Sequence, residues 1–174
     1  MWDQWRPPST PSSFKVFRLT SKVLLPSMKI LVINGPNLNL LGIREPEIYG
    51  NRSYADLVRF IESVAKDCGV ATEIRQTNHE GVIVDWIQEC RGTFDALVIN
   101  AAAYTHTSVA IHDAIKAVQI RTVEVHLSEP KNRDDFRKVS FIEPVAERTC
   151  SGRGFESYAD AIRYFAAGER PGPI

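Results

Sequence analysis

The chain has 174 residues, enough for one domain with a core on both sides of a sheet and too few to expect two domains. Its 21 Lys and Arg residues balance its 21 Asp and Glu residues, so net charge suggests no nucleic-acid or acidic-membrane partner. The apolar runs are as short as strands, far below the ~20 residues that a membrane helix needs.

Cysteine usage favours a reducing compartment. The three cysteines are odd in number and widely spaced, at Cys68, Cys90 and Cys150. They therefore offer neither a disulfide framework nor a Cys-x-x-Cys metal or redox motif. We expect a cytoplasmic protein.

The first 27 residues differ in character from the rest. They include the turn-rich run Pro7-Pro-Ser-Thr-Pro-Ser-Ser13 and more basic than acidic residues, but no apolar stretch followed by a small-residue cleavage site. We interpret residues 1–27 as a disordered extension or as upstream sequence wrongly read as coding, which leaves open whether Met1 or Met28 begins the mature chain. A single folded domain is expected over 28–168, with a tail over 169–174.

From Lys29 onward, short β-branched runs alternate with longer helical periods, which predicts βαβ units and a parallel sheet. Five strands are expected near 29–34, 70–77, 95–100, 121–126 and 145–150. Short connections and right-handed crossovers favour an α/β, doubly wound, flavodoxin-like sheet in the order 2-1-3-4-5. In that order the winding reverses between the first and third strands. The loops after Asn34, Asn100 and His126 should therefore converge on one site.

Four helices are expected between and after these strands. The first begins at Ser53, where Ser-x-x-Asp56 forms a capping box, and ends at Gly69. A second spans about 78–91, a third follows Thr107 or Ser108, and the last covers about 155–167. The apolar spacing predicts that the later three helices bury Val82, Trp86, Ile87 and Cys90, then Ala110, Ala114, Ile115 and Val118, and finally Tyr158, Ile162 and Phe165.

The connection after the first strand is long. It runs for sixteen residues, from Gly35 to Gly50, against the ~2–6 that are usual in such units. Arg44 and Tyr49 lie inside it, between Gly42 and Gly50, which is typical of a lid that closes over a ligand. No Gly-x-Gly-x-x-Gly or Gly-Lys-Ser/Thr pattern is present, so a nucleotide is not expected.

Two further connections carry polar side chains. Asn100 and His106 flank three alanines, a tyrosine and a threonine after the third strand, where the small residues leave room for a compact ligand. Either residue alone is weak evidence for a binding site, since Asn100 can stabilise a turn and His106 can form a hydrogen bond at the amino terminus of the next helix. The fourth strand ends with Glu124 and His126 on one face.

A buried carboxylate costs several kcal/mol unless it is paired, so His126 is the natural partner of Glu124. If Glu124 holds one ring nitrogen, the other can exchange a proton with a substrate. A purely structural Glu-His pair is the alternative. The remaining histidines, His79 and His112, form no i, i+4 pair with another histidine, and no metal site is expected.

Four ordered motifs together resemble type II dehydroquinase (type II 3-dehydroquinate dehydratase). They are Asn34-Gly-Pro-Asn-Leu-Asn-Leu-Leu-Gly-x-Arg-x-Pro-x-x-Tyr-Gly50, Asn78-His-Glu-Gly81, Ala103-Tyr-Thr-His-Thr-Ser108 and Glu124-Val-His-Leu-Ser128. The resemblance covers Met28 to Ala166, including Phe136-Arg137-x-x-Ser140 and the Gly152-x-Gly-Phe segment.

The resemblance implies a flavodoxin-like subunit, usually in a dodecamer of trimers, that eliminates water from 3-dehydroquinate without a cofactor or Schiff base. It implies that Tyr49 is the base, that Arg44 favours the tyrosinate, and that Asn37 helps to hold a water that stabilises the enolate. His126, oriented by Glu124, would protonate the departing hydroxyl. The residues implied to bind substrate are Asn100, His106, Asp113, Arg137 and the backbone at Leu127 and Ser128.

These roles are physically reasonable for the lid residues. A tyrosine with a pKa near ~10 is a poor base at neutral pH. A cation ~4 Å away at an effective dielectric constant of ~20 contributes about 4 kcal/mol, or roughly three pKa units before desolvation. Arg44 would therefore suffice once the lid closes, although both residues would be ordinary exposed loop residues if no lid forms.

The sequence departs from the family pattern after Ser128. Glu129 adds a negative charge near the expected carboxylate pocket and Pro130 removes an amide donor, which puts substrate affinity in question. Val139 stands where the family often has His. Two alternatives remain open, a non-enzymatic module that binds a small anion or a protein, and a catalytically silent scaffold. The sequence does not decide between biosynthetic and catabolic use of the reaction.

Overall fold

The computed structural model describes residues 28–43, 52–130 and 134–168. Within them a five-stranded, all-parallel sheet has the order β2-β1-β3-β4-β5, which confirms the expected doubly wound, flavodoxin-like topology. The strands are β1 (Lys29–Asn34), β2 (Ala71–Gln76), β3 (Ala96–Asn100), β4 (Arg121–Val125) and β5 (Arg148–Cys150). β1 and β3 are neighbours, and their last residues, Asn34 and Asn100, are paired in register.

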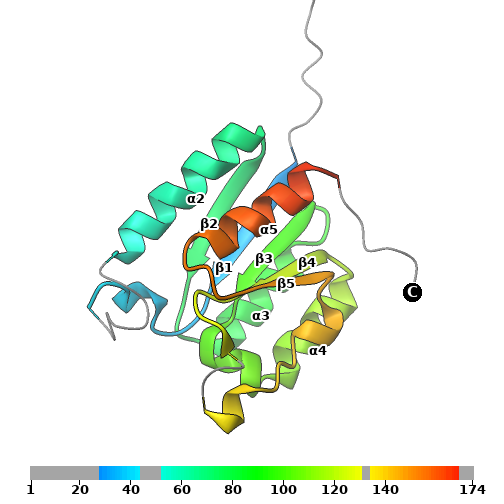
Figure 1. Ribbon diagram of the computed structural model, residues 1–174. Coiled ribbons are helices and arrows are strands. Elements are labelled where there is room, and N and C mark those ends of the chain that lie inside the picture. The colour runs from blue at the N-terminus through cyan, green and yellow to red at the C-terminus, as the bar shows by residue number, and fades with distance from the viewer. Residues whose placement is uncertain (1–27, 44–51, 131–133, 169–174) are drawn as a thin grey trace, which may run out of the picture.

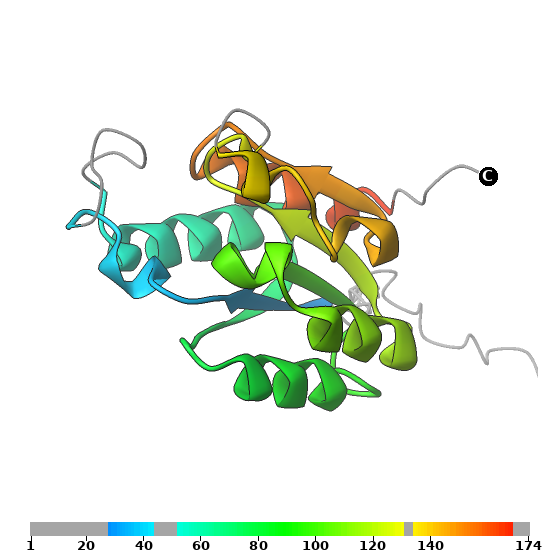
Figure 2. The same ribbon diagram turned by 90° about the horizontal axis from the view of Figure 1, so that it is seen from below.

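The sheet lies between two pairs of helices, as Figures 1 and 2 show. Helices α2 (Tyr54–Cys68) and α5 (Glu156–Ala166) cover one face, and α3 (Glu80–Glu89) and α4 (Val109–Val118) cover the other. β1 alternates between the two cores: Ile30 and Val32 join the first cluster, and Leu31 and Ile33 join the second. This two-sided burial explains why β1 is almost continuously apolar.

The helix ends follow the expected local chemistry. Ser53 begins α2 with a complete capping box, in which its hydroxyl accepts from Asp56 N and the Asp56 carboxylate accepts from Ser53 N at 2.8 Å. Gly69 ends this helix in the left-handed conformation, at φ 68°. Ser108 caps α4, and its hydroxyl accepts from Ile111 N at 3.0 Å.

Two of the predicted buried positions are wrong by one residue. Val82 is only partly buried and Ala110 is exposed, whereas the next residues, Ile83 and Ile111, are fully buried. Trp86 and Val118 are also only partly buried, but both pack against the core. In each helix several apolar residues stand in a row, so periodicity does not single out the inward one. The larger isoleucine takes the buried place and is followed four residues later by another buried isoleucine.

The connections contain short 3₁₀ helices at Leu38–Leu40, Ala102–His106, Asp135–Arg137 and Glu143–Val145. The first two follow β1 and β3 at the carboxyl ends of those strands. Among the described helices, none combines the length and apolarity required to cross a membrane.

Candidate active site

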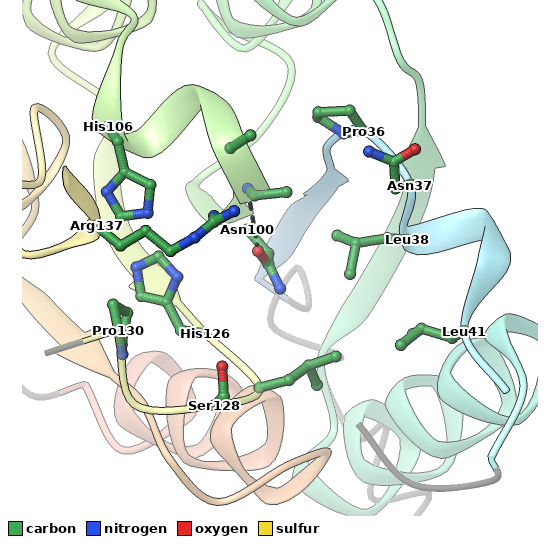
Figure 3. A pocket seen from close by; sticks show the side chains of 13 residues that line it. Pro36, Asn37, Leu38, Leu41, Asn100, His106, His126, Ser128, Pro130 and Arg137 are labelled. Atoms are coloured by element: carbon green, nitrogen blue, oxygen red, sulfur yellow. Dashed lines mark hydrogen bonds between the residues drawn. The ribbon is translucent and has the colours of Figure 1, made fainter. Parts of the chain in front are cut away.

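A cavity of about 250 Å³ opens at the carboxyl ends of β1, β3 and β4, where the sequence places the site. Figure 3 shows Asn37 and Leu38 on one side of it, His106, Arg137 and His126 on the other, and Asn100 between them. The lining residues are Pro36, Asn37, Leu38, Leu41, Asn100, Ala102, Ala103, His106, His126, Leu127, Ser128, Pro130 and Arg137. The three predicted loops therefore do converge.

The loops after β1 and β3 meet at Gly35. Its amide donates to the carbonyl of Asn100 at 2.8 Å, and a Cβ at this position would lie 2.5 Å from the carbonyl oxygen of Ala101. Only glycine permits this approach. The contact brings Asn37 and Asn100 to the same cavity.

Asn37 adopts a left-handed conformation, at φ 67°, which asparagine tolerates better than most residues. Its backbone amide donates to Asn78 Oδ1 at 2.9 Å, and Gln76 Nε2 donates to the same oxygen at 3.1 Å. The Asn78-His-Glu-Gly81 motif thus supports the loop that carries Asn37, and it contributes no side chain to the cavity lining.

Glu124 and His126 form the pair that their spacing predicts. The carboxylate is fully buried, and its Oε1 lies 3.0 Å from His126 Nε2. The imidazole is almost fully buried yet lines the cavity. Nδ1 is therefore the ring nitrogen that remains available for proton exchange.

Three hydroxyl groups complete the surroundings of the Glu124 carboxylate. Thr105 Oγ1 donates to Oε1 at 3.0 Å, Ser140 Oγ donates to Oε1 at 2.9 Å, and Thr149 Oγ1 donates to Oε2 at 3.3 Å. Burial raises the pKa of Glu124, but hydrogen bonds from His126, Ser140 and Thr105 outweigh it, so the pKa lies below its ordinary value. Glu124 is therefore a carboxylate at neutral pH.

His106 is oriented by the segment after the Asp135–Arg137 helix. Its Nδ1 lies 2.7 Å from the carbonyl oxygen of Val139. A carbonyl only accepts, so Nδ1 carries the hydrogen and Nε2 of the neutral ring is an acceptor. Val139 contributes this backbone oxygen, while its side chain is exposed.

Arg137 contributes the cation of the cavity. In the view of Figure 3 its side chain passes between the rings of His106 and His126, and its guanidinium points toward the middle of the cavity. Its Nε is buried without a hydrogen-bond partner among the described residues, although Asp134 Oδ2 lies 3.4 Å away. A buried donor without a partner favours an oxygen-bearing ligand at this position.

In the segment after β4, the charge of Glu129 has a hydrogen-bond partner outside the candidate site. Its carboxylate accepts from Ser151 Oγ at 2.6 Å, and Glu129 lines a neighbouring polar cavity of about 510 Å³ instead of this one. The two cavities share Pro130, His106, His126 and Arg137 among their lining residues. Leu127 and Ser128 line the candidate site, and among the described residues their amides donate to no carbonyl.

The structure brings most of the predicted site residues together. Asn37, Asn100, His106, His126, Leu127, Ser128 and Arg137 line the cavity, and Glu124 lies behind His126. Asp113 is exposed on α4 and is not among the lining residues. Arg44 and Tyr49 lie outside the described residues. Sequence reasoning did not find Pro36, Leu38 and Leu41, whose apolar side chains carry no chemical signal.

Among the residues described, no group of three or more His, Cys, Asp or Glu side chains is placed to hold a metal ion. The groups that do converge are an imidazole backed by a carboxylate, an arginine whose Nε makes no hydrogen bond among the described residues, and amide donors. Such a set can bind an oxygen-rich anion and transfer a proton to it.

Comparison with known proteins identifies relatives over almost all of the described chain. The sequence profile of the family "Dehydroquinase class II" matches residues 28–166. A 3-dehydroquinate dehydratase from Campylobacter hominis is 56% identical over 127 residues, which cover 73% of this chain and 82% of the relative. One from Geotalea daltonii is 52% identical over 136 residues, covering 78% and 94%.

Solved structures agree with these relatives. The type II dehydroquinase from Butyrivibrio crossotus has a TM-score of 0.77 and 49% identity, covering 79% of this chain and 96% of its own. The enzyme from Propionibacterium acnes also has a TM-score of 0.77, at 36% identity, with 81% and 99% covered.

Proposed function

Because this chain belongs to the class II dehydroquinase family and is therefore a dehydratase of 3-dehydroquinate, we propose that it forms 3-dehydroshikimate through an enolate, with Tyr49 as base and His126 as acid. The observation that carries the proposed mechanism is the buried Glu124 carboxylate, 3.0 Å from His126 Nε2, behind a cavity that the imidazole lines. This arrangement orients one ring nitrogen and leaves the other to act on a ligand.

In the first step, the phenolate of Tyr49 takes the proton from the carbon beside the ketone. The electrons of that C–H bond form the enolate. Arg44 stabilises the tyrosinate, and Asn37 holds the water that stabilises the enolate oxygen. Asn37 lines the cavity, which is consistent with a role in holding this water.

In the second step, the enolate re-forms the ketone and expels the hydroxyl group, which takes a proton from His126 and leaves as water. The new double bond is conjugated with the carbonyl group. Glu124 stabilises the protonated imidazole before this step, because its ionised carboxylate contacts the ring. Tyr49 has then gained one proton and His126 has lost one, so proton exchange with solvent restores both.

The remaining groups of the cavity bind the substrate's oxygens. The guanidinium of Arg137, whose Nε makes no hydrogen bond within the described part of the chain, fits the hydroxyl or carboxylate oxygens, and His106 Nε2 accepts from a hydroxyl. The amides of Leu127 and Ser128 supply donors for the carboxylate. The amide of Asn100 adds one more donor to this set.

The experiment follows the enone absorbance of the product after purified protein is mixed with 3-dehydroquinate, with a borohydride-treated sample beside it. We expect turnover that survives borohydride, since no Schiff base forms, and that collapses in both Tyr49→Phe and His126→Ala. Folded, assembled wild-type protein without turnover would contradict the proposal and favour the non-enzymatic binding module.

We propose further that the chain assembles into a dodecamer. Asp113 is exposed and absent from the cavity of its own chain, so it would reach a bound substrate only from a neighbouring subunit. Light scattering during size-exclusion chromatography tests this proposal, and a particle of monomer mass would contradict both the assembly and the part of Asp113. A cytoplasmic location stays a prediction from the cysteine pattern.

A further inference from the structure

Behind the cavity, a chain of hydrogen bonds runs through the apolar core between β1, β3 and α5. Asn100 Nδ2 donates to Tyr158 Oη at 2.9 Å, and Tyr158 Oη donates to Asn34 Oδ1 at 2.6 Å. Asn34 and Tyr158 are fully buried, and Asn100 is nearly so. Three polar side chains in an apolar cluster cost more than apolar residues of similar size unless every group is bonded.

The donor-to-acceptor direction of these hydrogen bonds is fixed at one end by a backbone N–H group, which can only donate. The backbone amide of Ala102 donates to Asn100 Oδ1 at 3.2 Å. Ala102 is one of three described non-glycine residues with positive φ, at 53°, so the backbone is held in an unfavourable conformation next to this contact. Because a backbone N–H only donates, Oδ1 of Asn100 must be the acceptor and Nδ2 must face Tyr158.

Each later link follows from the first. Tyr158 Oη accepts from Asn100, so its own hydrogen goes to Asn34 Oδ1, and Asn34 Nδ2 is left to donate weakly to Tyr54 Oη at 3.4 Å. Burial raises the pKa of Tyr158 well above its ordinary value, so the hydroxyl always has a hydrogen to donate. The amide of Asn100 is thus held at both ends.

We infer that Tyr158, with Asn34 behind it, is a positioning residue that fixes the Asn100 amide so that its second Nδ2 hydrogen is presented to an oxygen of the bound substrate. Asn100 lines the cavity, and among the described residues only one partner uses the two hydrogens of Nδ2. A rotated amide would instead turn its NH₂ group toward the amide of Ala102, donor against donor. The network therefore selects a ligand acceptor group at this point.

This inference rests on the proposed function, because the cavity is taken to hold 3-dehydroquinate. It goes further in assigning a task to two buried residues that never touch the substrate. If they only stabilise the fold, their removal should lower stability and leave KM unchanged in the protein that still folds.

The test is Tyr158→Phe, which removes one oxygen. We expect KM for 3-dehydroquinate to rise by about tenfold, the equivalent of one neutral hydrogen bond, with kcat nearly unchanged. The matched control is Tyr164→Phe, on the same helix, whose hydroxyl donates to Glu147 at 3.1 Å away from the cavity, and its KM should not change. An unchanged KM in folded Tyr158→Phe would overturn the inference.

A double-mutant cycle separates positioning from general stability. Asn100→Ala alone should raise KM, and Tyr158→Phe added to Asn100→Ala should raise it no further, because the residue through which Tyr158 acts is gone. Additive effects on KM would overturn the inference.

Asn34 provides a second route if Tyr158→Phe does not fold. Asn34→Leu removes the acceptor for the Tyr158 hydroxyl, which then competes for Asn100 Oδ1 and should raise KM. Asn34→Asp keeps that acceptor, so its KM should stay closer to wild type. Equal KM values for the two variants would overturn the inference.

A crystal structure of Tyr158→Phe gives an answer that does not depend on activity. The inference predicts that the Asn100 side chain rotates away from its contact with Ala102 or occupies two orientations. An Asn100 side chain in its original place would contradict it. Absence of turnover in wild-type protein would instead contradict the proposed function, so the two failures are distinguishable.

Discussion

Replacement of Glu124 by glutamine should lower both stability and catalytic activity. The groups around its side chain donate hydrogen bonds, so they are matched only by oxygens that carry no hydrogen. Ser140 Oγ donates to both carboxylate oxygens, at 2.9 and 3.1 Å, and itself accepts from Ile142 N at 3.0 Å and Glu143 N at 2.9 Å. Both lone pairs of this hydroxyl are in use, so it cannot turn to accept a hydrogen from a glutamine NH₂ group.

The magnitude follows from the bonds that glutamine would lose. One hydrogen bond to a charged acceptor contributes about 1.5–3 kcal/mol, and a buried donor left unpaired costs about 1–3 kcal/mol. We therefore expect Glu124→Gln to lower the free energy of unfolding by about 3 kcal/mol at pH 7. Loss of the carboxylate beside His126 should lower kcat on the order of a hundredfold, the smaller end of what general acid catalysis contributes.

The assays are urea unfolding and steady-state turnover at 3-dehydroquinate saturation. Glu143→Gln is the control, because this exposed side chain borders the neighbouring cavity and should leave both quantities unchanged. A Glu124→Gln protein as stable and as active as wild type would show that the site does not require a carboxylate.

The pH dependence gives a further check with a definite sign. The folded-state pKa of Glu124 is lowered, so its contribution to stability is fully present above the pKa of an unfolded glutamate, about 4.3, and is lost as pH falls through the folded pKa. The difference in unfolding free energy between wild type and Glu124→Gln should shrink as pH falls below about pH 4. A difference that grows in acid would contradict the lowered pKa.

Three more predictions follow from single contacts. Gly35→Ala should lower the free energy of unfolding by about 1–3 kcal/mol in urea, because its Cβ would meet the Ala101 oxygen at 2.5 Å, and unaltered stability would argue against this approach. Burial raises the pKa of the Cys90 thiol to about 11, so mass spectrometry should find it unmodified by iodoacetamide at pH 8 until the protein is unfolded. Glu129→Gln should leave KM unchanged, since its carboxylate contacts Ser151 outside the candidate site. A marked fall in KM would show that the negative charge of Glu129 repels the substrate.

The sequence was sufficient to predict the order of the sheet and the position of the site. The strand ends at Asn34 and Asn100, together with the polar residues after β4, lie at the switch point as expected. Capping by Ser53 was predictable because Asp56 completes a local motif. These features depend on near neighbours in the chain or on rules of topology, which a single sequence contains.

The buried polar contacts were not predictable in the same way. Tyr158 fits the apolar spacing of its helix, and only the packing of α5 on the sheet brings its hydroxyl between Asn34 and Asn100. Ser140 lies in a polar loop, and nothing local indicates that it donates to Glu124 sixteen residues earlier. Such contacts join distant segments and require three-dimensional coordinates.

The exchange of the substrate's α-proton in D₂O tests most directly whether Tyr49 acts as the base and His126 as the acid. In His126→Ala, we predict that 3-dehydroquinate recovered after incubation carries deuterium beside the ketone, because Tyr49 still forms the enolate while elimination is lost. In Tyr49→Phe, the recovered substrate should carry none above a protein-free blank. Recovered substrate without deuterium from folded His126→Ala, beside an active wild-type enzyme, would contradict the assignment of His126 as an acid that acts only after the proton is removed.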